Sequence, residues 1–183
     1  MSRSHVHKNR VVGSVAAGVI AALLSPAAHA ATATATFQVQ IEIQKSCSVT
    51  AGAGSNIDLG TVASTATNSA GSNTISVNCT KSTPYFIGLA PSAGNGGTNS
   101  GSGAMASTGG VAGNTDKVAY QLRSTTGSSG TVWGNTATTT VVGNGVAGTG
   151  TGAAQTHTVY ATVPTANYTA DAYADTVTVT VNY

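Results

Sequence analysis

The sequence predicts an all-β domain built as a two-sheet sandwich. Runs in which every second residue is apolar recur along the chain, and clusters of Gly, Ser and Asn separate them. An alternation with period two places one side of each strand against a core and the other side in water. After the first thirty residues, helix-forming Leu, Glu and Lys are few, whereas Thr and Val, which favour strands, are abundant. We therefore expect strands rather than helices.

The alternating runs give the expected strand positions. These are 36–44, 46–50, 57–62, 73–79, 85–89, 117–123, 131–133, 137–142, 156–163 and 174–183. Two glycine-rich stretches interrupt them, at Ala90–Asn114 and Gly143–Ala154. Their composition cannot build a core, so we expect both to be surface loops.

Residues 1–30 have the composition of an export signal. A basic start that contains Arg3 and Lys8 precedes an uncharged apolar run at 11–24, and Ala28-His29-Ala30 fits the small-x-small pattern of a cleavage site. The apolar run is too short to span a bilayer, which disfavours the alternative of a retained membrane anchor. The mature chain is then 31–183, the length of one domain.

The mature chain carries little charge. The full sequence has seven basic and five acidic residues. Removal of Arg3, Lys8 and Arg10 with the signal leaves four basic against five acidic residues, a net charge of about −1. Basic residues this few do not form a track for nucleic acid. We expect no nucleic-acid partner.

Two cysteines, Cys47 and Cys79, follow the signal. Export places them in an oxidising compartment, where an even number of cysteines usually forms disulfides. We expect a Cys47–Cys79 bridge, with two separate buried thiols as the alternative. A zinc site lacks ligands, because His157 is the only histidine after residue 30.

The first mature segment, 31–44, alternates throughout. Its apolar side chains point one way and its Gln and Glu side chains point the other. No hairpin partner lies beside it in sequence, so it pairs either within its own domain or with another molecule. The pattern does not decide between these two. The apolar residues of this segment are Phe37, Val39, Ile41 and Ile43.

The last expected strand, 174–183, mirrors the first. Its apolar residues share one face, as in a half-buried strand of a sandwich. An Ig-like sandwich needs about seven strands. If 174–183 ends the chain, the strand that normally follows would be missing, and strand addition from another subunit would fill the gap. The apolar face consists of Val177, Val179, Val181 and Tyr183.

The order of these features resembles the spore coat protein U domain family, which includes major subunits of archaic chaperone–usher pili. The resemblance covers nearly the whole mature chain. The loop at 90–114 departs from it by its length and glycine content. The matching motifs are the alternating run that ends four residues before Cys47, Ile57-Asp-Leu-Gly60, Ile75-Ser-Val-Asn-Cys79, Val118-Ala-Tyr-Gln-Leu-Arg123, Val132-Trp-Gly134 and Asp175-Thr-Val-Thr-Val-Thr-Val-Asn-Tyr183.

The resemblance implies an incomplete Ig-like β-sandwich at 45–183 that is completed by donor-strand exchange. A periplasmic chaperone would lend a strand to each new subunit, and an outer-membrane usher would replace it with segment 31–44 of the next subunit. Phe37, Val39, Ile41 and Ile43 would be the donor side chains. Val177, Val179, Val181 and Tyr183 would edge the acceptor groove, with the Tyr183 carboxylate as a chaperone anchor. Identical or related subunits would form a fimbrium on the cell surface that supports adhesion and biofilm formation.

Signals for chemistry are weak. The G-x-G-x-x-G match at 143–148 precedes no helix, His157 lies in a strand, and Asp171 and Asp175 flank a turn. We expect no catalytic residue, cofactor, metal or small-molecule substrate. The alternative function is a self-complete secreted β-sandwich that coats a surface or binds carbohydrate, for instance through Trp133.

Overall fold

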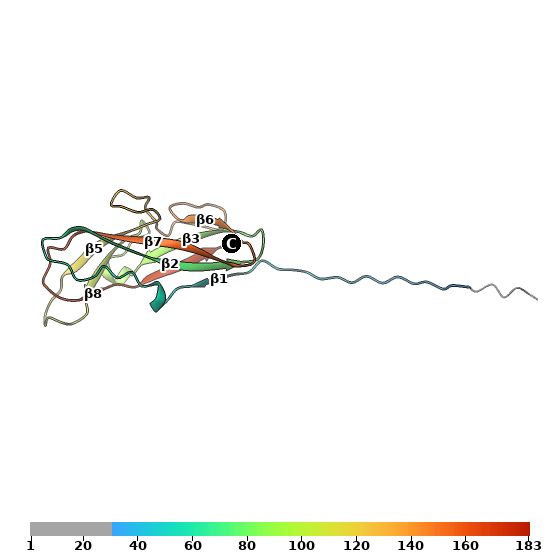
Figure 1. Cartoon of the computed structure of the whole chain (residues 1–183), viewed down its shortest axis with the longest axis horizontal. Coiled ribbons are helices and arrows are strands. Elements are labelled where there is room, and N and C mark those ends of the chain that lie inside the picture. The colour runs from blue at the N-terminus through green and yellow to red at the C-terminus, as the bar shows by residue number, and fades with distance from the viewer. Residues whose placement is uncertain (1–30) are drawn as a thin grey trace, which may run out of the picture. The chain divides into compact units, whose positions relative to one another are not determined.

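The computed structural model describes residues 31–183, so the expected export signal at 1–30 lies outside the described residues. Within 31–183 the chain forms nine strands and two short 3-10 turns, which confirms the all-β prediction (Figure 1). The strands are β1 (Cys47–Thr50), β2 (Thr67–Cys79), β3 (Pro84–Pro91), β4 (Ser102–Ser107), β5 (Lys117–Arg123), β6 (Val146–Thr149), β7 (Ala154–Thr165), β8 (Tyr173–Ala174) and β9 (Val177–Asn182); the turns are η1 (Ala53–Ser55) and η2 (Ala93–Asn95).

The strands form two antiparallel sheets. The larger sheet has the order β1-β2-β7-β5-β4-β8, and the smaller sheet has the order β6-β3-β9. The β2–β7 ladder is the longest, running from Thr67 opposite Thr165 to Asn78 opposite Ala154. In the smaller sheet β3 lies in the middle, and β9 pairs with β3 alone. One edge of β9 is therefore free in the described chain.

The core lies between the two sheets. Trp133 is its largest fully buried side chain, and its indole Nε1 donates a hydrogen bond to the backbone oxygen of Ile87 at 2.8 Å. The buried residues come mainly from the alternate positions of β2, β3, β5 and β7, as the period-two pattern predicts. They are Ile75, Val77, Cys79, Tyr85, Ile87, Leu89, Val118, Tyr120, Leu122, Trp133, Val159, Ala161 and Val163.

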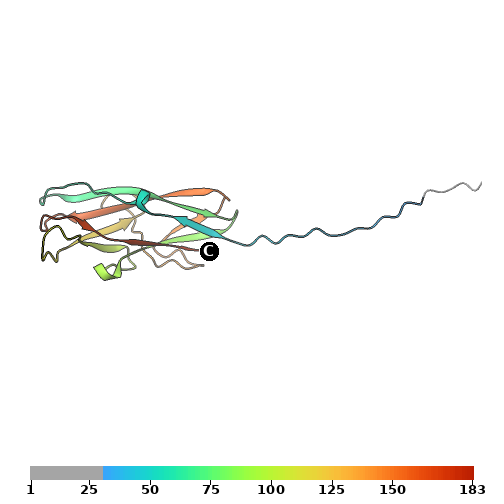
Figure 2. The same ribbon diagram turned by 90° about the horizontal axis from the view of Figure 1, so that it is seen from below.

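The β2–β7 ladder separates two ends of the sandwich. At one end, which we name the disulfide end, Thr80 follows β2 and binds the chain just before β1: its backbone N–H donates to the Ser46 oxygen at 2.9 Å. At the other end, which we name the loop end, residues 166–176 follow β7. Strand β9 starts at the loop end and runs toward the disulfide end (Figure 2).

A disulfide joins Cys47 to Cys79, as expected from the sequence. The two residues lie directly opposite each other in the β1–β2 register, with their Cα atoms 4.1 Å apart. Strand β1 has only four residues, so four residue pairs hold it to β2. The disulfide therefore fixes covalently an edge strand that is otherwise weakly held.

Several strand predictions were wrong. Residues 36–44 and 57–62 belong to no strand, and 137–142 form a loop in which the Thr138 N–H donates to the Val141 oxygen at 2.8 Å. The glycine-rich stretches 90–114 and 143–154 are not only loops, because they contain β4 and β6. In both strands a glycine meets a buried tyrosine ring of the neighbouring strand: Gly103 lies against Tyr120, and Gly148 lies against Tyr85.

Replacing Cys79 with Ser should lower the free energy of unfolding. The bridge closes a loop with a sequence separation of 32, for which the chain-entropy relation gives about 3–4 kcal/mol. Urea unfolding of the purified protein, with the unsubstituted protein treated with reductant as the matched comparison, measures the loss. An unchanged unfolding midpoint in both samples would show that the bridge is dispensable.

Candidate functional site

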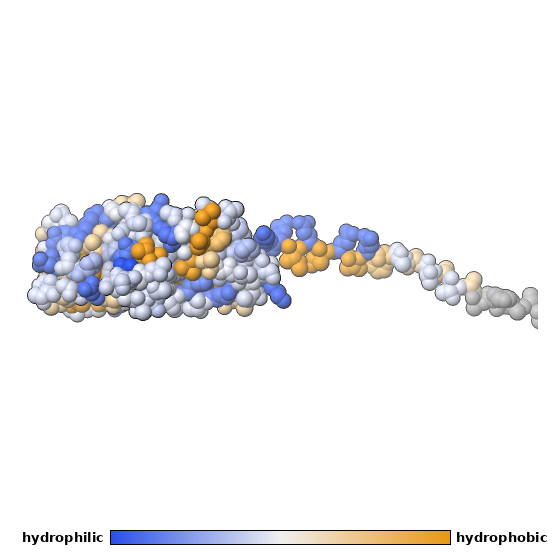
Figure 3. Space-filling model, turned by 90° about the horizontal axis from the view of Figure 1, so that it is seen from above, coloured by the Kyte–Doolittle hydropathy of each residue, from blue (hydrophilic) through white to orange (hydrophobic). Residues whose placement is uncertain are grey.

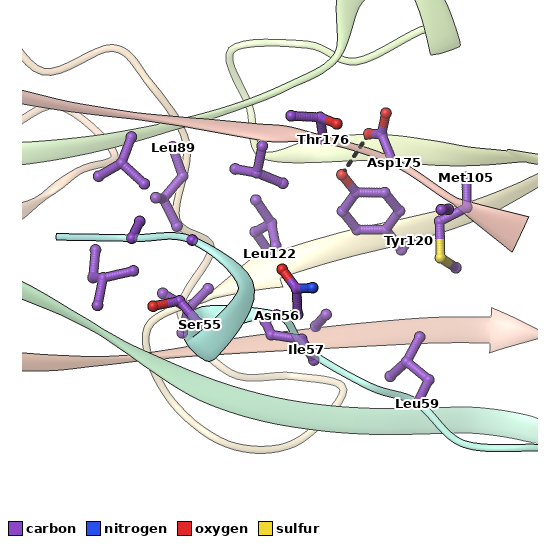
Figure 4. A pocket seen from close by; sticks show the side chains of 18 of the residues that line it. Ser55, Asn56, Ile57, Leu59, Leu89, Met105, Tyr120, Leu122, Asp175 and Thr176 are labelled. Carbon is purple, nitrogen blue, oxygen red and sulfur yellow. Dashed lines mark hydrogen bonds between the residues drawn. The ribbon is translucent and has the colours of Figure 1, made fainter.

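A groove of about 410 Å³ opens between the larger sheet and β9 (Figure 4). Its floor is apolar, because it is made by the inward faces of β2, β5 and β7 together with Leu89 of β3. Strand β9 forms one wall, and the segment 51–59 forms the other. The apolar lining residues are Ile57, Leu59, Ile75, Leu89, Met105, Leu122, Val159, Ala161, Val177 and Val179.

The groove exists because β9 has no neighbour on the edge that borders the groove, which we call its inner edge. The inward side chains Val177, Val179 and Val181 pack against the core, yet all three are only half-buried. In a strand that is paired along one edge only, the N–H and C=O groups of every second residue point away from the partner strand and have no ladder partner. The wall therefore offers both apolar surface and backbone hydrogen-bonding groups to an extended chain.

The opposite wall is held by side-chain contacts to β2. The Asn73 amide donates to the backbone oxygens of Asn56 at 2.7 Å and Gly54 at 3.1 Å. Gly71 lets this segment approach, because a Cβ at that position would lie 3.0 Å from Ile57 and 3.1 Å from Leu59. A side chain at residue 71 would push the wall away from the sheet.

The groove is polar where β9 begins. The Asp175 carboxylate accepts a hydrogen bond from the Tyr120 hydroxyl at 2.7 Å (Figure 4). It also accepts hydrogen bonds from the Asn95 amide at 2.8 Å and the Ser92 N–H at 3.3 Å. Burial, followed by the bond to Asp175, raises the pKa of Tyr120 well above its usual value. Tyr120 therefore remains a neutral donor, and the cluster ties the start of β9 to β5 and η2.

The segment 31–44 keeps its apolar face in solvent. Residues 31–46 belong to no strand. Figure 3 shows the hydrophobic and hydrophilic sides of this segment as separate stripes. The exposed fractions are 87% for Phe37, 88% for Val39, 86% for Ile41 and 75% for Ile43.

Other residues considered for chemistry have structural roles. The His157 Nε2 lies 3.0 Å from the Tyr85 hydroxyl, and burial lowers the pKa of His157. Trp133 is buried, so it cannot form an outer sugar-binding face. The glycines at 143–148 precede and enter β6 rather than a helix. Among the described residues no cluster of His, Cys, Asp or Glu could hold a metal ion.

Asp171 organises the loop end, a role that its sequence context does not indicate. Its carboxylate accepts hydrogen bonds from the Ser107 hydroxyl at 2.6 Å, the Asn114 amide at 2.9 Å and the N–H groups of Ala172 and Val111. These bonds, led by Ser107, lower the pKa of Asp171 to about 2. Ser107 and Asn114 lie more than fifty residues from Asp171, so no local pattern could have revealed the cluster.

The fold is an all-β sandwich of two antiparallel sheets in which the inner edge of β9 is unpaired. The chain belongs to the Spore Coat Protein U domain family, whose model matches residues 33–180. That match includes most of the segment 31–44 as well as the sandwich. The described residues, 31–183, include no helix long and apolar enough to cross a bilayer.

One solved structure to which the chain is similar is the CsuC–CsuE chaperone–tip adhesion subunit pre-assembly complex from archaic chaperone-usher Csu pili of Acinetobacter baumannii. The sequence identity is 19% and the TM-score is 0.49. The alignment covers 77% of this chain and 40% of the other, so the chain spans about two-fifths of that protein's length. No curated protein matches the chain.

Acid should weaken the loop end through Asp171. Since its pKa in the folded protein is lowered to about 2, its contribution is complete above its unfolded pKa of about 4 and is lost as the pH falls toward 2. Urea unfolding at pH 7 should show the Asp171→Asn variant to be less stable than the unsubstituted protein. That difference should shrink at pH 2.5. A difference that stays constant with pH would contradict a charged Asp171 in this role.

Proposed function

We propose that this chain is a subunit of a surface pilus that polymerises by donor-strand exchange. The segment 31–44 of one copy would lie in the groove beside β9 of the next copy. The single observation that carries the proposal is the pairing of two unsatisfied features in one chain. These are a free inner edge with half-buried valines and an extended segment with a fully exposed apolar stripe.

The two features are complementary in chemistry. An added strand would bond to the N–H and C=O groups on the free edge of β9 and place alternate side chains in the groove. Burying Phe37, Val39, Ile41 and Ile43, now 75–88% exposed, would contribute about 6–12 kcal/mol at roughly 1.5–3 kcal/mol each. The Gln and Glu side chains of the segment would remain on the outer, solvent side.

The free subunit would need protection before assembly. An apolar groove beside an unpaired strand edge favours aggregation, and a lent strand would cover both. We therefore propose a periplasmic chaperone as the first partner and an outer-membrane usher as the site of exchange. Tyr183, which follows β9 and is 47% exposed, is the proposed contact for the chaperone. The assembled fibre would be located on the cell surface and would serve adhesion and biofilm formation.

The family membership and the disulfide of an exported protein support this proposal. The proposed mechanism contains no bond-making step, because one strand replaces another in the same groove. Dissociation would be slow, since all side chains and ladder bonds of the donor must leave together. The exchange would therefore yield a stable polymer without covalent links between subunits.

An Ile41→Asp substitution should stop polymer growth, because it would place a carboxylate in the apolar groove without a partner. Gln40→Asp is the matched control: it adds the same charge to the opposite face of the same segment. Electron microscopy of cells that express each variant should show fibres for Gln40→Asp and none for Ile41→Asp. Normal fibres from Ile41→Asp would refute the donor role.

Deletion of residues 31–43 should separate the pilus subunit from a self-complete coat protein. Because these residues belong to no strand, their loss should leave the yield of chaperone-bound subunit unchanged and abolish assembly. Co-purification with the chaperone and sedimentation of polymers measure the two outcomes. A deletion that unfolds the domain would instead indicate that the segment completes its own sheet.

A further inference from the structure

The charges of the described chain are divided between the two ends of the sandwich. Lys45 and Lys81 lie together at the disulfide end, because residues on both sides of Lys45 bind Thr80, the neighbour of Lys81. The Ser46 N–H donates to the Thr80 hydroxyl at 3.1 Å, and that hydroxyl donates to the Gln44 oxygen at 3.4 Å. Both lysines are exposed.

The loop end is acidic. Three carboxylates are attached to the segment 166–176: Asp171 and Asp175 belong to it, and Asp116 accepts a hydrogen bond from the Thr169 N–H at 2.9 Å. Their recorded donors are hydroxyl, amide and backbone N–H groups, which leave the negative charge uncompensated. Lys117 lies at the same end, where its Nζ donates to the Gly94 oxygen at 3.0 Å. Three negative charges and one positive charge leave about −2.

The two ends cannot neutralise each other within one copy. The 13 residues of β2 separate them, a distance of about 40 Å at 3.3 Å per residue. The screening length at physiological salt is about 8 Å. Of the other charged groups, Asp58 and Arg123 belong to neither end, and Glu42 lies on the segment 31–44. The Tyr183 carboxylate follows β9 at the disulfide end and reduces the charge there from +2 to about +1.

We propose that the basic disulfide end of one copy docks against the acidic loop end of the next copy. This inference rests on the proposed donor-strand exchange and adds an electrostatic contact to it. Lys45 and Lys81 of the arriving copy would face Asp116, Asp171 and Asp175 of the receiving copy. The partner is thus a second copy of this chain, recognised by opposite charge.

The position of the groove supports this arrangement. Strand β9 begins at Val177 beside Asp175, which lines the groove, and ends at Asn182 at the disulfide end. A segment antiparallel to β9 would place its residue 43 near Asp175, so that Lys45 emerges at the acidic loop end. A parallel segment would instead bring Lys45 beside the receiving copy's own Lys45 and Lys81. Charge repulsion disfavours that second arrangement.

The contact should act mainly on the rate of association. Exposed charges of opposite sign steer two molecules together, whereas burial of apolar surface determines how slowly they separate. Because the charges are exposed or half-buried, salt should screen the effect. The final polymer should therefore be equally stable at low and high salt, although it forms at different rates.

Light scattering of the exported protein, purified with its chaperone if the two co-purify, tests the proposal. We expect polymer growth to be about tenfold slower at about 300 mM NaCl than at about 20 mM NaCl. At the lower salt, Lys81→Glu should slow growth several-fold and Lys117→Glu should speed it. Each substitution changes the net charge by the same amount, so an effect of overall charge would move both rates in the same direction.

Equal rates at both salt concentrations, or rate changes of the same sign in the two variants, would overturn the proposed contact. Circular dichroism and thermal unfolding of both variants verify that they are folded; the salt series on the unsubstituted protein needs no variant. If the unsubstituted protein forms no polymer at all, the proposed function itself fails. If it polymerises at a rate that depends neither on salt concentration nor on the two substitutions, only the proposed end-to-end contact is refuted.

Discussion

Strand β9 is paired along one edge only, and the groove beside it follows from this arrangement. Backbone N–H and C=O groups inside a protein require partners, and β9 obtains them from β3 alone. The half-burial of its valines, the open groove and the position of Asp175 at its start all follow from this missing neighbour. The same chain also carries an exposed apolar stripe on the segment 31–44.

Much of the fold could be predicted where large apolar side chains alternate with polar ones. Strand β5 was expected at 117–123 and occurs there, because Val118, Tyr120 and Leu122 all face the core. The alternation of apolar and polar residues did not predict strands β4 and β6, where a tyrosine ring of the neighbouring strand fills the space beside a glycine. Gly103 in β4 and Gly148 in β6 provide space for tyrosine rings of adjacent strands, so both strands have the composition of loops.

The candidate site, too, could be predicted from the sequence only in part. The faces of 31–44 and β9 were predictable because a period of two needs no knowledge of the fold. The wall at 51–59 and the Tyr120–Asp175 bond were not, because each joins residues far apart in the chain. Residues 137–142 were expected to form a strand and instead form a loop. Their Thr and Val content favours a strand, but local hydrogen bonds among Thr138, Thr140 and Val141 close a loop.

The position of the disulfide has a mechanical consequence. In a polymer joined through residues 31–44, a pulling force enters each subunit just before Cys47. Strand β1, with four residues, would slip along β2 under such tension, because only four residue pairs hold it. The bond to Cys79 passes the load directly to β2, whose long ladder with β7 resists in shear along its whole length. In such a filament the disulfide would keep β1 attached to its subunit under load.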